Sequence, residues 1–230
     1  MNSDKLSQKR LSLAIGGMVF VLVVFAWFDS ADCQDVTNAA GNRHVALVVD
    51  RSGSMEFLVR EVVDNINTVI DALEPTDRLS ILFFEDPYGV VRFIENQSVS
   101  EVTRLSYDDY FPLGGTPLYD AVGIAIDDVV RPTIGNGNSA RYGVVIVISD
   151  GEENSSIYYS LSDARRSVSS ALAQNVSIQF YGMGPAASQE AAALGIPLDD
   201  TLQVAESASG LEEAFDDVQR SLDRSRSSSC

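Results

Sequence analysis

Three oxygen-bearing side chains, those of Asp50, Ser52 and Ser54, lie at alternate positions directly after an apolar run at residues 45–49. Such a run is typical of a strand buried on both faces. We therefore expect Asp50 at the carboxyl end of a strand, where open α/β sheets bind ligands. Oxygen ligands without His or Cys suit a hard cation such as Mg²⁺, Ca²⁺ or Mn²⁺. Because Asp, Ser and Gly are also common in turns and helix caps, these residues alone leave a plain turn open.

Two later segments carry side chains of the same kind. The segment 113–121 (LGGTPLYDA) contains Thr116 directly before a proline, a pattern typical of the start of a helix. Asp150 follows a second apolar run at residues 142–148. The carboxyl ends of parallel strands meet at one edge of a sheet, so we expect both segments to lie near Asp50.

Alternating strand and helix patterns surround these segments and predict an α/β fold. The expectation is a doubly wound, mostly parallel, six-stranded sheet with helices on both faces. Turn residues between the second and third strands predict a hairpin, and hence one antiparallel edge strand. The expected strands are 45–49, 79–84, 90–94, 142–148, 176–181 and 202–205. The expected helices are 57–73, 118–130, 161–173, 187–194 and 211–222, with a short helix within 98–111 and a capping box formed by Ser209 and Glu212 at the start of the last one.

Composition limits the function classes. Lys and Arg number 16 against 33 Asp and Glu, which gives a net charge of −17. An acidic surface repels phosphate, so we expect no nucleic-acid partner. His44 is the single histidine, and no cysteine lies within the strand and helix pattern. This is poor material for nucleophile–base catalysis, and we expect that the protein is not an enzyme.

The first 42 residues have the pattern of a membrane anchor. Residues 1–10 are basic, residues 11–28 carry no charge, and acidic residues follow. Eighteen helical residues span about 27 Å, close to the thickness of a bilayer core. The charge bias places residues 1–10 in the cytoplasm and the rest of the chain outside, as a single-pass membrane protein. A cleaved signal peptide, which would release a secreted protein, is the alternative. Residues 29–42 read as a linker.

Three motifs together resemble one family. The patterns D-x-S-x-S at 50–54, GGTPLYDA at 114–121 and SDG at 149–151 look like those of the von Willebrand factor type A (VWA) domain, and DRLSILFF at 77–84 resembles its second strand. The resemblance covers residues 43–223 and leaves 224–230 as a mobile tail.

The resemblance implies a metal-ion-dependent adhesion site (MIDAS). Carried over position by position, its metal ligands are Asp50, Ser52, Ser54, Thr116 and Asp150. It implies Mg²⁺, or Ca²⁺ or Mn²⁺, with a protein partner's Asp or Glu carboxylate on the remaining coordination position. Two carboxylates only just neutralise a divalent ion, so the ion can accept one more anionic oxygen.

Four further residues are assigned more loosely. Glu152 and Glu153 would stand on the rim of the site, either as solvated surface or as charges that favour basic residues on a partner. Cys33 and Cys230 flank the domain, and some extracellular family members close their termini with such a disulfide. Lipidation of Cys33 and intermolecular pairing stay open.

The predicted function is therefore a divalent-cation-dependent adhesion or interaction module. One alternative is a cell-envelope assembly component in which the metal is not essential. A hydrolase is a weaker alternative, because a phosphoaspartyl enzyme would need a second Asp where Ser52 stands. A serine hydrolase would need a His later in the chain than His44.

Overall fold

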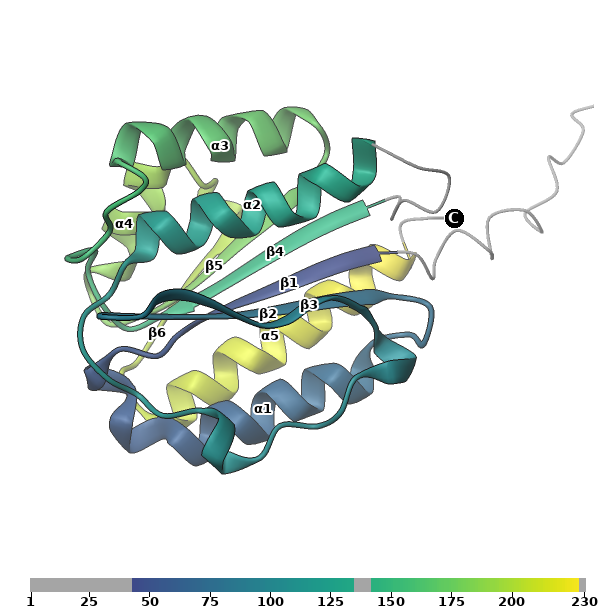
Figure 1. Ribbon diagram of the computed structural model, residues 1–230, viewed down its shortest axis with the longest axis horizontal. Helices are drawn as coiled ribbons and strands as arrows, with labels where there is room; N and C mark the ends of the chain where they lie inside the picture. Colours follow the sequence, from purple (N-terminus) through teal and green to yellow (C-terminus); the bar gives the residue numbers. More distant parts are fainter. Residues whose placement is uncertain (1–42, 135–141, 228–230) are drawn as a thin grey trace, which may run out of the picture. The chain divides into compact units, whose positions relative to one another are not determined.

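The fold is built on a six-stranded sheet with the strand order β3-β2-β1-β4-β5-β6 (Figure 1). The computed structural model describes residues 43–134 and 142–227. The β2–β3 pair is antiparallel and the other four pairs are parallel, which confirms the expected fold class. The strands are β1 (Arg43–Asp50), β2 (Arg78–Glu85), β3 (Gly89–Ser98), β4 (Tyr142–Ser149), β5 (Ser177–Met183) and β6 (Thr201–Val204).

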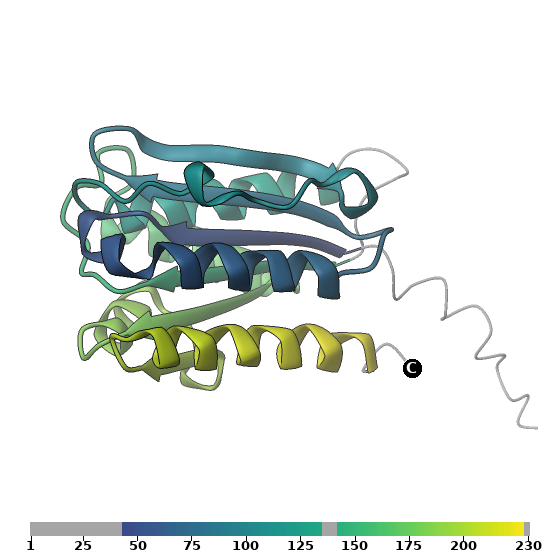
Figure 2. The ribbon, with the colours of Figure 1, turned by 90° about the horizontal axis from the view of Figure 1, so that it is seen from below.

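Helices cover both faces of this sheet. On one face lie α2 (Leu118–Ile134), α3 (Leu161–Ala173) and α4 (Ala187–Leu194), and on the other lie α1 (Val59–Ala72) and α5 (Ala208–Ser227) (Figure 1). Figure 2 shows α1 and α5 side by side along the sheet.

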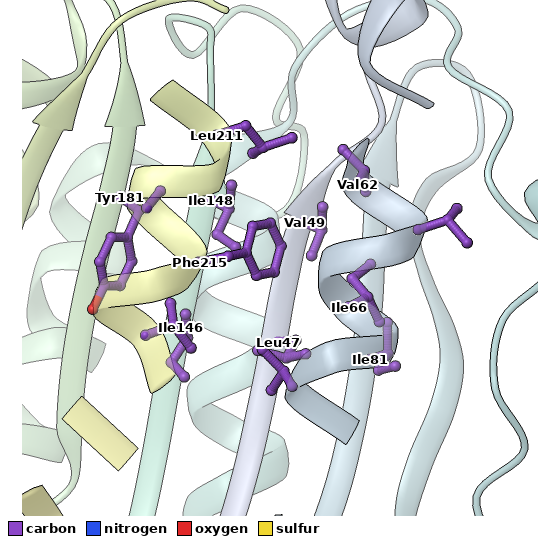
Figure 3. Close-up of a cluster of buried hydrophobic side chains, with 14 of the residues drawn as sticks. Leu47, Val49, Val62, Ile66, Ile81, Ile146, Ile148, Tyr181, Leu211 and Phe215 are labelled. Atoms are coloured by element: carbon purple, nitrogen blue, oxygen red, sulfur yellow. The ribbon is translucent and has the colours of Figure 1, made fainter. Parts of the chain in front are cut away.

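Each strand of the sheet centre contributes to two separate apolar cores. Along β1, Leu47 and Val49 point to the core under α1 and α5, whereas Ala46 and Val48 point to the core under α2, α3 and α4. Figure 3 shows Leu47 and Val49 beside Phe215 of α5. Burial on both faces explains why β1 is a continuous apolar run rather than an alternating one.

The first and last helices begin differently from the expectation. Residues 53–58 form a 3-10 turn, and α1 follows it from Val59. The expected capping box at the last helix is wrong in its register: α5 begins at Ala208, and Ser207 accepts a hydrogen bond from Gly210 N at 3.2 Å. The apolar stripe predicted for the last helix is buried, and the side chains of Leu211 and Phe215 are fully buried.

The expected third strand and short helix also differ from the structure. β3 ends four positions later than the pattern 90–94 predicted, because Asn96 adopts a left-handed φ of 43° and its N–H donates to Ser80 Oγ at 2.9 Å. The pairing with β2 shifts register there and then continues. Residues 99–101 and 107–109 form two separate 3-10 turns instead of one helix.

Several expectations concern the chain ends. The anchor or signal at 11–28, the linker at 29–42 and both cysteines lie outside the described residues. None of the helices in the described part of the chain combines the length and apolar content that a membrane span requires. α5 continues to Ser227, into the segment 224–230 that was expected to be a mobile tail.

Candidate metal centre

Three loops meet at the carboxyl edge of the central strands. The loop after β1 is joined to the loop before α2, because Gly53 N donates to Gly114 O at 3.0 Å. The loop before α2 is joined in turn to the loop after β4: Thr116 N donates to Asn154 Oδ1 at 2.8 Å, and Asn154 N donates to Thr116 O at 3.2 Å. The three segments singled out in the sequence therefore lie together, at the left of the view in Figure 1.

Asp50 places a fully buried carboxylate at the base of these loops. Its Oδ1 accepts a hydrogen bond from Ser52 N at 2.8 Å, and its Oδ2 accepts one from Ser149 Oγ at 2.5 Å. Burial raises the pKa of Asp50 to about 7, the hydrogen bonds from Ser149 and Ser52 oppose this shift, and the charge of Asp150 adds to it.

A chain of hydroxyl groups connects the first loop to Asp150. Ser52 Oγ lies 3.0 Å from Ser54 Oγ, and Ser54 Oγ donates to Asp150 Oδ1 at 2.9 Å. The pKa of the half-buried Asp150 is raised, mainly by burial. The hydrogen bond from Ser54 lowers it and the charge of Glu206 raises it. The polar groups therefore converge from two strands onto one small region.

Thr116 completes the set from the third loop. Its side chain is buried, and its Oγ1 lies 3.0 Å from where a Cβ on Gly151 would be. The hydroxyl therefore lies against the backbone of the residue that follows Asp150. A side chain at Gly151 would press on this hydroxyl, so the SDG pattern keeps the approach open.

This donor set fits a hard divalent cation. Asp50 is buried, and no Arg, Lys or His within the described ranges forms an ion pair with it. A buried carboxylate without a cationic partner is costly. Hydroxyl and carboxylate oxygens are the ligands that Mg²⁺, Ca²⁺ and Mn²⁺ prefer. In the part of the chain that the structure describes, no three side chains of His, Cys, Asp or Glu gather closely enough to hold a metal ion, so this donor set depends on its hydroxyl groups.

A buried ion pair that the sequence reasoning missed anchors the first loop. Arg51 Nη2 lies 2.5 Å from Glu85 Oε1, and Arg51 Nε donates to Glu85 Oε2 at 3.0 Å. The guanidinium also lies 4.0 Å from the ring centre of Phe111. The pair joins the residue after β1 to the end of β2. In the sequence, the basic residue Arg51 inside the D-x-S-x-S pattern was the signal that could have indicated this ion pair.

A second missed residue, Asp120, shapes the loop after β4. This buried carboxylate accepts hydrogen bonds from the backbone N–H groups of three successive residues, Ile157, Tyr158 and Tyr159, at 2.9, 2.9 and 2.6 Å. The side chains of Ile157 and Tyr158 are exposed on this ordered backbone. In the sequence, the acidic residue in the first turn of the helix after GGTP was the signal that could have indicated this role.

The structure changes the reading of one of the two rim residues. Glu152 is exposed, as expected for the rim. Glu153 instead turns its carboxylate inward: Oε1 accepts from Ser155 N and Ser156 N at 2.9 and 2.6 Å, and Oε2 accepts from Tyr119 N at 2.9 Å. Backbone donors of the loop and of α2 therefore bind both of its oxygens, and the half-buried Glu153 orders the loop beside the site.

The doubly wound fold and the oxygen-rich edge of its sheet indicate a class of protein, and comparison with known families identifies it. Residues 44–217 match the family model of the von Willebrand factor type A domain. The chain belongs to this family. A search of curated proteins finds no match.

Solved structures share the fold at low sequence identity. Proximal thread matrix protein 1 from the mussel byssus, with a zinc-occupied MIDAS motif, is 17% identical with a TM-score of 0.57, over 80% of this chain and 46% of that one. The pilus adhesin SpaC from Lactobacillus rhamnosus GG is 14% identical with a TM-score of 0.62, over 78% and 30%. The SpRpn10 VWA domain is 14% identical with a TM-score of 0.52, over 76% and 95%. The chain thus spans less than half of the mussel and pilus proteins.

Proposed function

We propose that this protein is a divalent-cation-dependent interaction module that binds a protein partner through a carboxylate of that partner. The cation site consists of five oxygen-bearing side chains, those of Asp50, Ser52, Ser54, Thr116 and Asp150. When bound, the cation supplies a Lewis-acidic position for one external anionic oxygen. The proposal includes no enzymatic activity.

The observation that carries the proposal is the unbroken polar path from β1 to β4. Asp50 bonds to Ser52 N, Ser52 lies beside Ser54, and Ser54 donates to Asp150. This path brings two carboxylates together with no cationic side chain paired to either within the described residues. A divalent ion would relieve the electrostatic cost of this arrangement.

The electrostatics also indicate the kind of partner. The chain carries a net charge of −17, so an acidic partner approaches against a repulsive field unless the cation reverses that field locally. We therefore infer a partner whose binding acid is surrounded by neutral or basic residues. Glu152, exposed beside the site, favours the same choice.

The basic and then apolar pattern of the N-terminal residues supports a proposal for the location of the module. We propose that residues 11–28 anchor the chain in a membrane, with the VWA domain on the extracytoplasmic side. Similar folds in a pilus adhesin and in a byssus matrix protein support an adhesive role outside the cell. Cleavage after the apolar segment would make the protein a secreted one with the same site.

A direct test is calorimetric titration of the full-length chain with Mg²⁺, Mn²⁺ and Ca²⁺. We expect one binding site in the native protein and loss of that site in Asp150→Asn. Asp108→Asn is the matched control, because Asp108 is exposed in a 3-10 turn. Equal cation binding by the native chain and Asp150→Asn contradicts the proposed metal site.

The open coordination position has a separate test. Bound Mn²⁺ enhances the relaxation of water protons while it holds exchangeable water. We expect acetate, used as a carboxylate probe, to lower this enhancement by displacing that water. An enhancement that acetate does not change would argue against carboxylate binding. It would favour the assembly role in which the metal is not essential.

A further inference from the structure

Exposed apolar side chains gather on the loops that form the candidate cation site. Of the large apolar side chains that are exposed in the described part of the chain, five lie on these three loops: Phe57, Phe111, Leu113, Ile157 and Tyr158. Single exposed apolar residues are ordinary on a protein surface, whereas several on neighbouring segments mark an interaction site. Their positions relative to the cation ligands follow from the local structure of each loop.

The loop after β1 places Phe57 beside one of the proposed cation ligands. Residues 53–58 form a 3-10 turn, in which side chains three positions apart lie on the same face. Met55 and Leu58 form its buried face, whereas Ser54 and Phe57 lie together on an exposed face. Phe57 is 65% exposed. It therefore stands one turn from Ser54, about 6 Å along the axis of the turn.

A hollow of about 350 Å³ opens beside Phe57. Val59 and Tyr107 line it together with Arg60. The ring of Tyr107 is held in place, because its hydroxyl donates to Asp64 Oδ1 at 3.0 Å and the Arg60 guanidinium lies 4.9 Å from the ring centre. An ordered aromatic ring and the exposed Phe57 thus border one hollow, which can receive a large apolar side chain.

The loop after β4 presents two further apolar side chains beside Thr116. Thr116 and Asn154 exchange two hydrogen bonds, at 2.8 and 3.2 Å. Asp120, in the first turn of α2, then accepts from the N–H groups of Ile157 and Tyr158 at 2.9 Å each. The side chains of these two residues are nevertheless 78% and 76% exposed. The hydrogen bonds hold the backbone of both residues before a partner binds, which reduces the conformational cost of docking.

The loop before α2 carries the remaining two apolar side chains and is held against Arg51. Leu113 N donates to Arg51 O at 2.8 Å, and the Arg51 guanidinium lies 4.0 Å from the centre of the Phe111 ring. Arg51 stands between the proposed cation ligands Asp50 and Ser52 in the sequence. On each of the three loops, exposed apolar side chains are therefore fixed next to residues of the candidate cation site.

We propose that these apolar side chains bind large apolar side chains that flank the acid of the protein partner. This inference rests on the proposed function and narrows the surroundings of that acid to apolar residues. A chain with a net charge of −17 attracts an acidic group only through the bound cation, so apolar burial supplies the remaining affinity. Apolar contacts also exclude water from the bond between cation and carboxylate, which strengthens that bond. Phe57 and Tyr158 are then specificity-determining residues.

A basic side chain of the partner is the alternative occupant of the hollow. Glu56 and Glu61 also line it and would attract a positive charge. Arg60 brings a positive charge to the same hollow and offsets much of theirs. Because the charges partly cancel while the Phe57 ring stays exposed, the lining favours an apolar occupant.

The test compares three synthetic peptides, acetylated and amidated at their ends: Ala-Ala-Asp-Ala-Ala, Ala-Leu-Asp-Leu-Ala and Ala-Arg-Asp-Arg-Ala. Their affinities for the full-length chain loaded with Mn²⁺ are measured through the relaxation of water protons, at physiological ionic strength. We expect the Leu peptide to bind the native chain about fivefold more tightly than the Ala peptide, and more tightly than the Arg peptide. In the double variant Phe57→Ser, Tyr158→Ser this advantage should fall below about twofold, with the affinity of the Ala peptide unchanged.

Leu198→Ser is the matched control. Leu198 is 76% exposed in the turn before β6, at the opposite edge of the sheet from the candidate site. The advantage of the Leu peptide should persist in this variant. The unfolding temperature of the double variant without cation should equal that of the native chain, because both substituted side chains are exposed.

The remaining outcomes separate the two proposals. Equal affinities of the Leu and Ala peptides overturn the apolar role and leave the cation site intact. Tighter binding of the Arg peptide than of the Leu peptide also overturns it, because the hollow then takes a basic side chain. An undiminished advantage of the Leu peptide in the double variant, or its loss in Leu198→Ser, contradicts the assignment to Phe57 and Tyr158. Absence of Mn²⁺-dependent binding for all three peptides contradicts the proposed function itself.

Discussion

The hydroxyl of Ser54 donates a hydrogen bond of 2.9 Å to Asp150, a residue 96 positions further along the chain. This bond joins the residues after β1 to the residue after β4, two strands that are neighbours in the sheet. It links the two carboxylate-bearing loops directly. Hydrogen bonds of the fold itself therefore hold these two parts of the candidate site together, which reduces the conformational cost of ligand binding.

The first prediction concerns the pH dependence of stability without cation. The pKa of Asp50 is raised from 3.8 to about 7 by burial. The folded state therefore binds this proton more tightly than the unfolded state. The free energy of unfolding should decrease as pH rises from about 4 to about 7 and then level off.

Asp50→Asn isolates this contribution. Its amide carries no charge, so at pH 8 with chelator we expect the variant to be more stable than the native chain by about 1–3 kcal/mol. The difference should shrink toward pH 5. Urea unfolding at several pH values measures it, and addition of Mg²⁺ should stabilise only the native chain. A variant that is less stable at pH 8 and equally so at pH 5 would contradict this account of Asp50.

A second prediction concerns Asp120. Replacing it by Ala leaves the N–H groups of Ile157, Tyr158 and Tyr159 without their acceptor. We expect a loss of about 2–3 kcal/mol in the free energy of unfolding and faster hydrogen exchange at these three amides. Glu152→Ala, a change at an exposed residue of the same loop, should have neither effect. Unchanged exchange in Asp120→Ala would show that other contacts order the loop.

A third prediction concerns the buried pair of Arg51 and Glu85. Arg51→Met alone leaves the Glu85 carboxylate buried without its partner and should cost about 3–5 kcal/mol. The double variant with Glu85→Leu removes both charges and should recover much of that loss. Chemical denaturation of the two single variants and the double variant measures the coupling. Additive losses would mean that the ion pair is not the anchor of the loop.

A fourth prediction concerns the cysteines outside the described residues. Arg43, the first residue of β1, donates to Leu222 O at 2.8 Å and to Ser225 Oγ at 2.9 Å near the end of α5. The start of β1 and the end of α5 therefore lie together. Cys33 is ten residues before Arg43 in the sequence, and Cys230 is five residues after Ser225. We predict an intramolecular disulfide between these two cysteines, in keeping with the proposed extracytoplasmic location. Peptide mapping without reduction should recover the linked pair, whereas a lipid on Cys33 or a disulfide-linked dimer would contradict it.

The apolar pattern was sufficient to predict the sheet. Residues 45–49 are buried on both faces of the sheet, so all of them are apolar, and this continuous apolar run predicts a central strand. Helices α3 and α4 were predicted with the observed bounds, because each buries one face and leaves the other exposed. The extension of β3 was not predictable, because it depends on the unusual backbone of Asn96 and on its bond to Ser80 in the neighbouring strand.

The candidate site was predictable only for residues that repeat a family pattern. Asp50 and Thr116 were found in this way. The roles of Asp120 and Glu153 in ordering the loop were missed, because their partners are backbone N–H groups and no spacing in the sequence specifies those.

The most direct test of the account is anomalous diffraction from crystals of the native protein soaked in Mn²⁺. We predict one peak among the side-chain oxygens of Ser52, Ser54 and Thr116, at about 2.1–2.3 Å from the hydroxyls, with Asp50 and Asp150 around it. A peak located elsewhere, or no peak at a Mn²⁺ concentration that saturates binding in solution, would contradict the central claim.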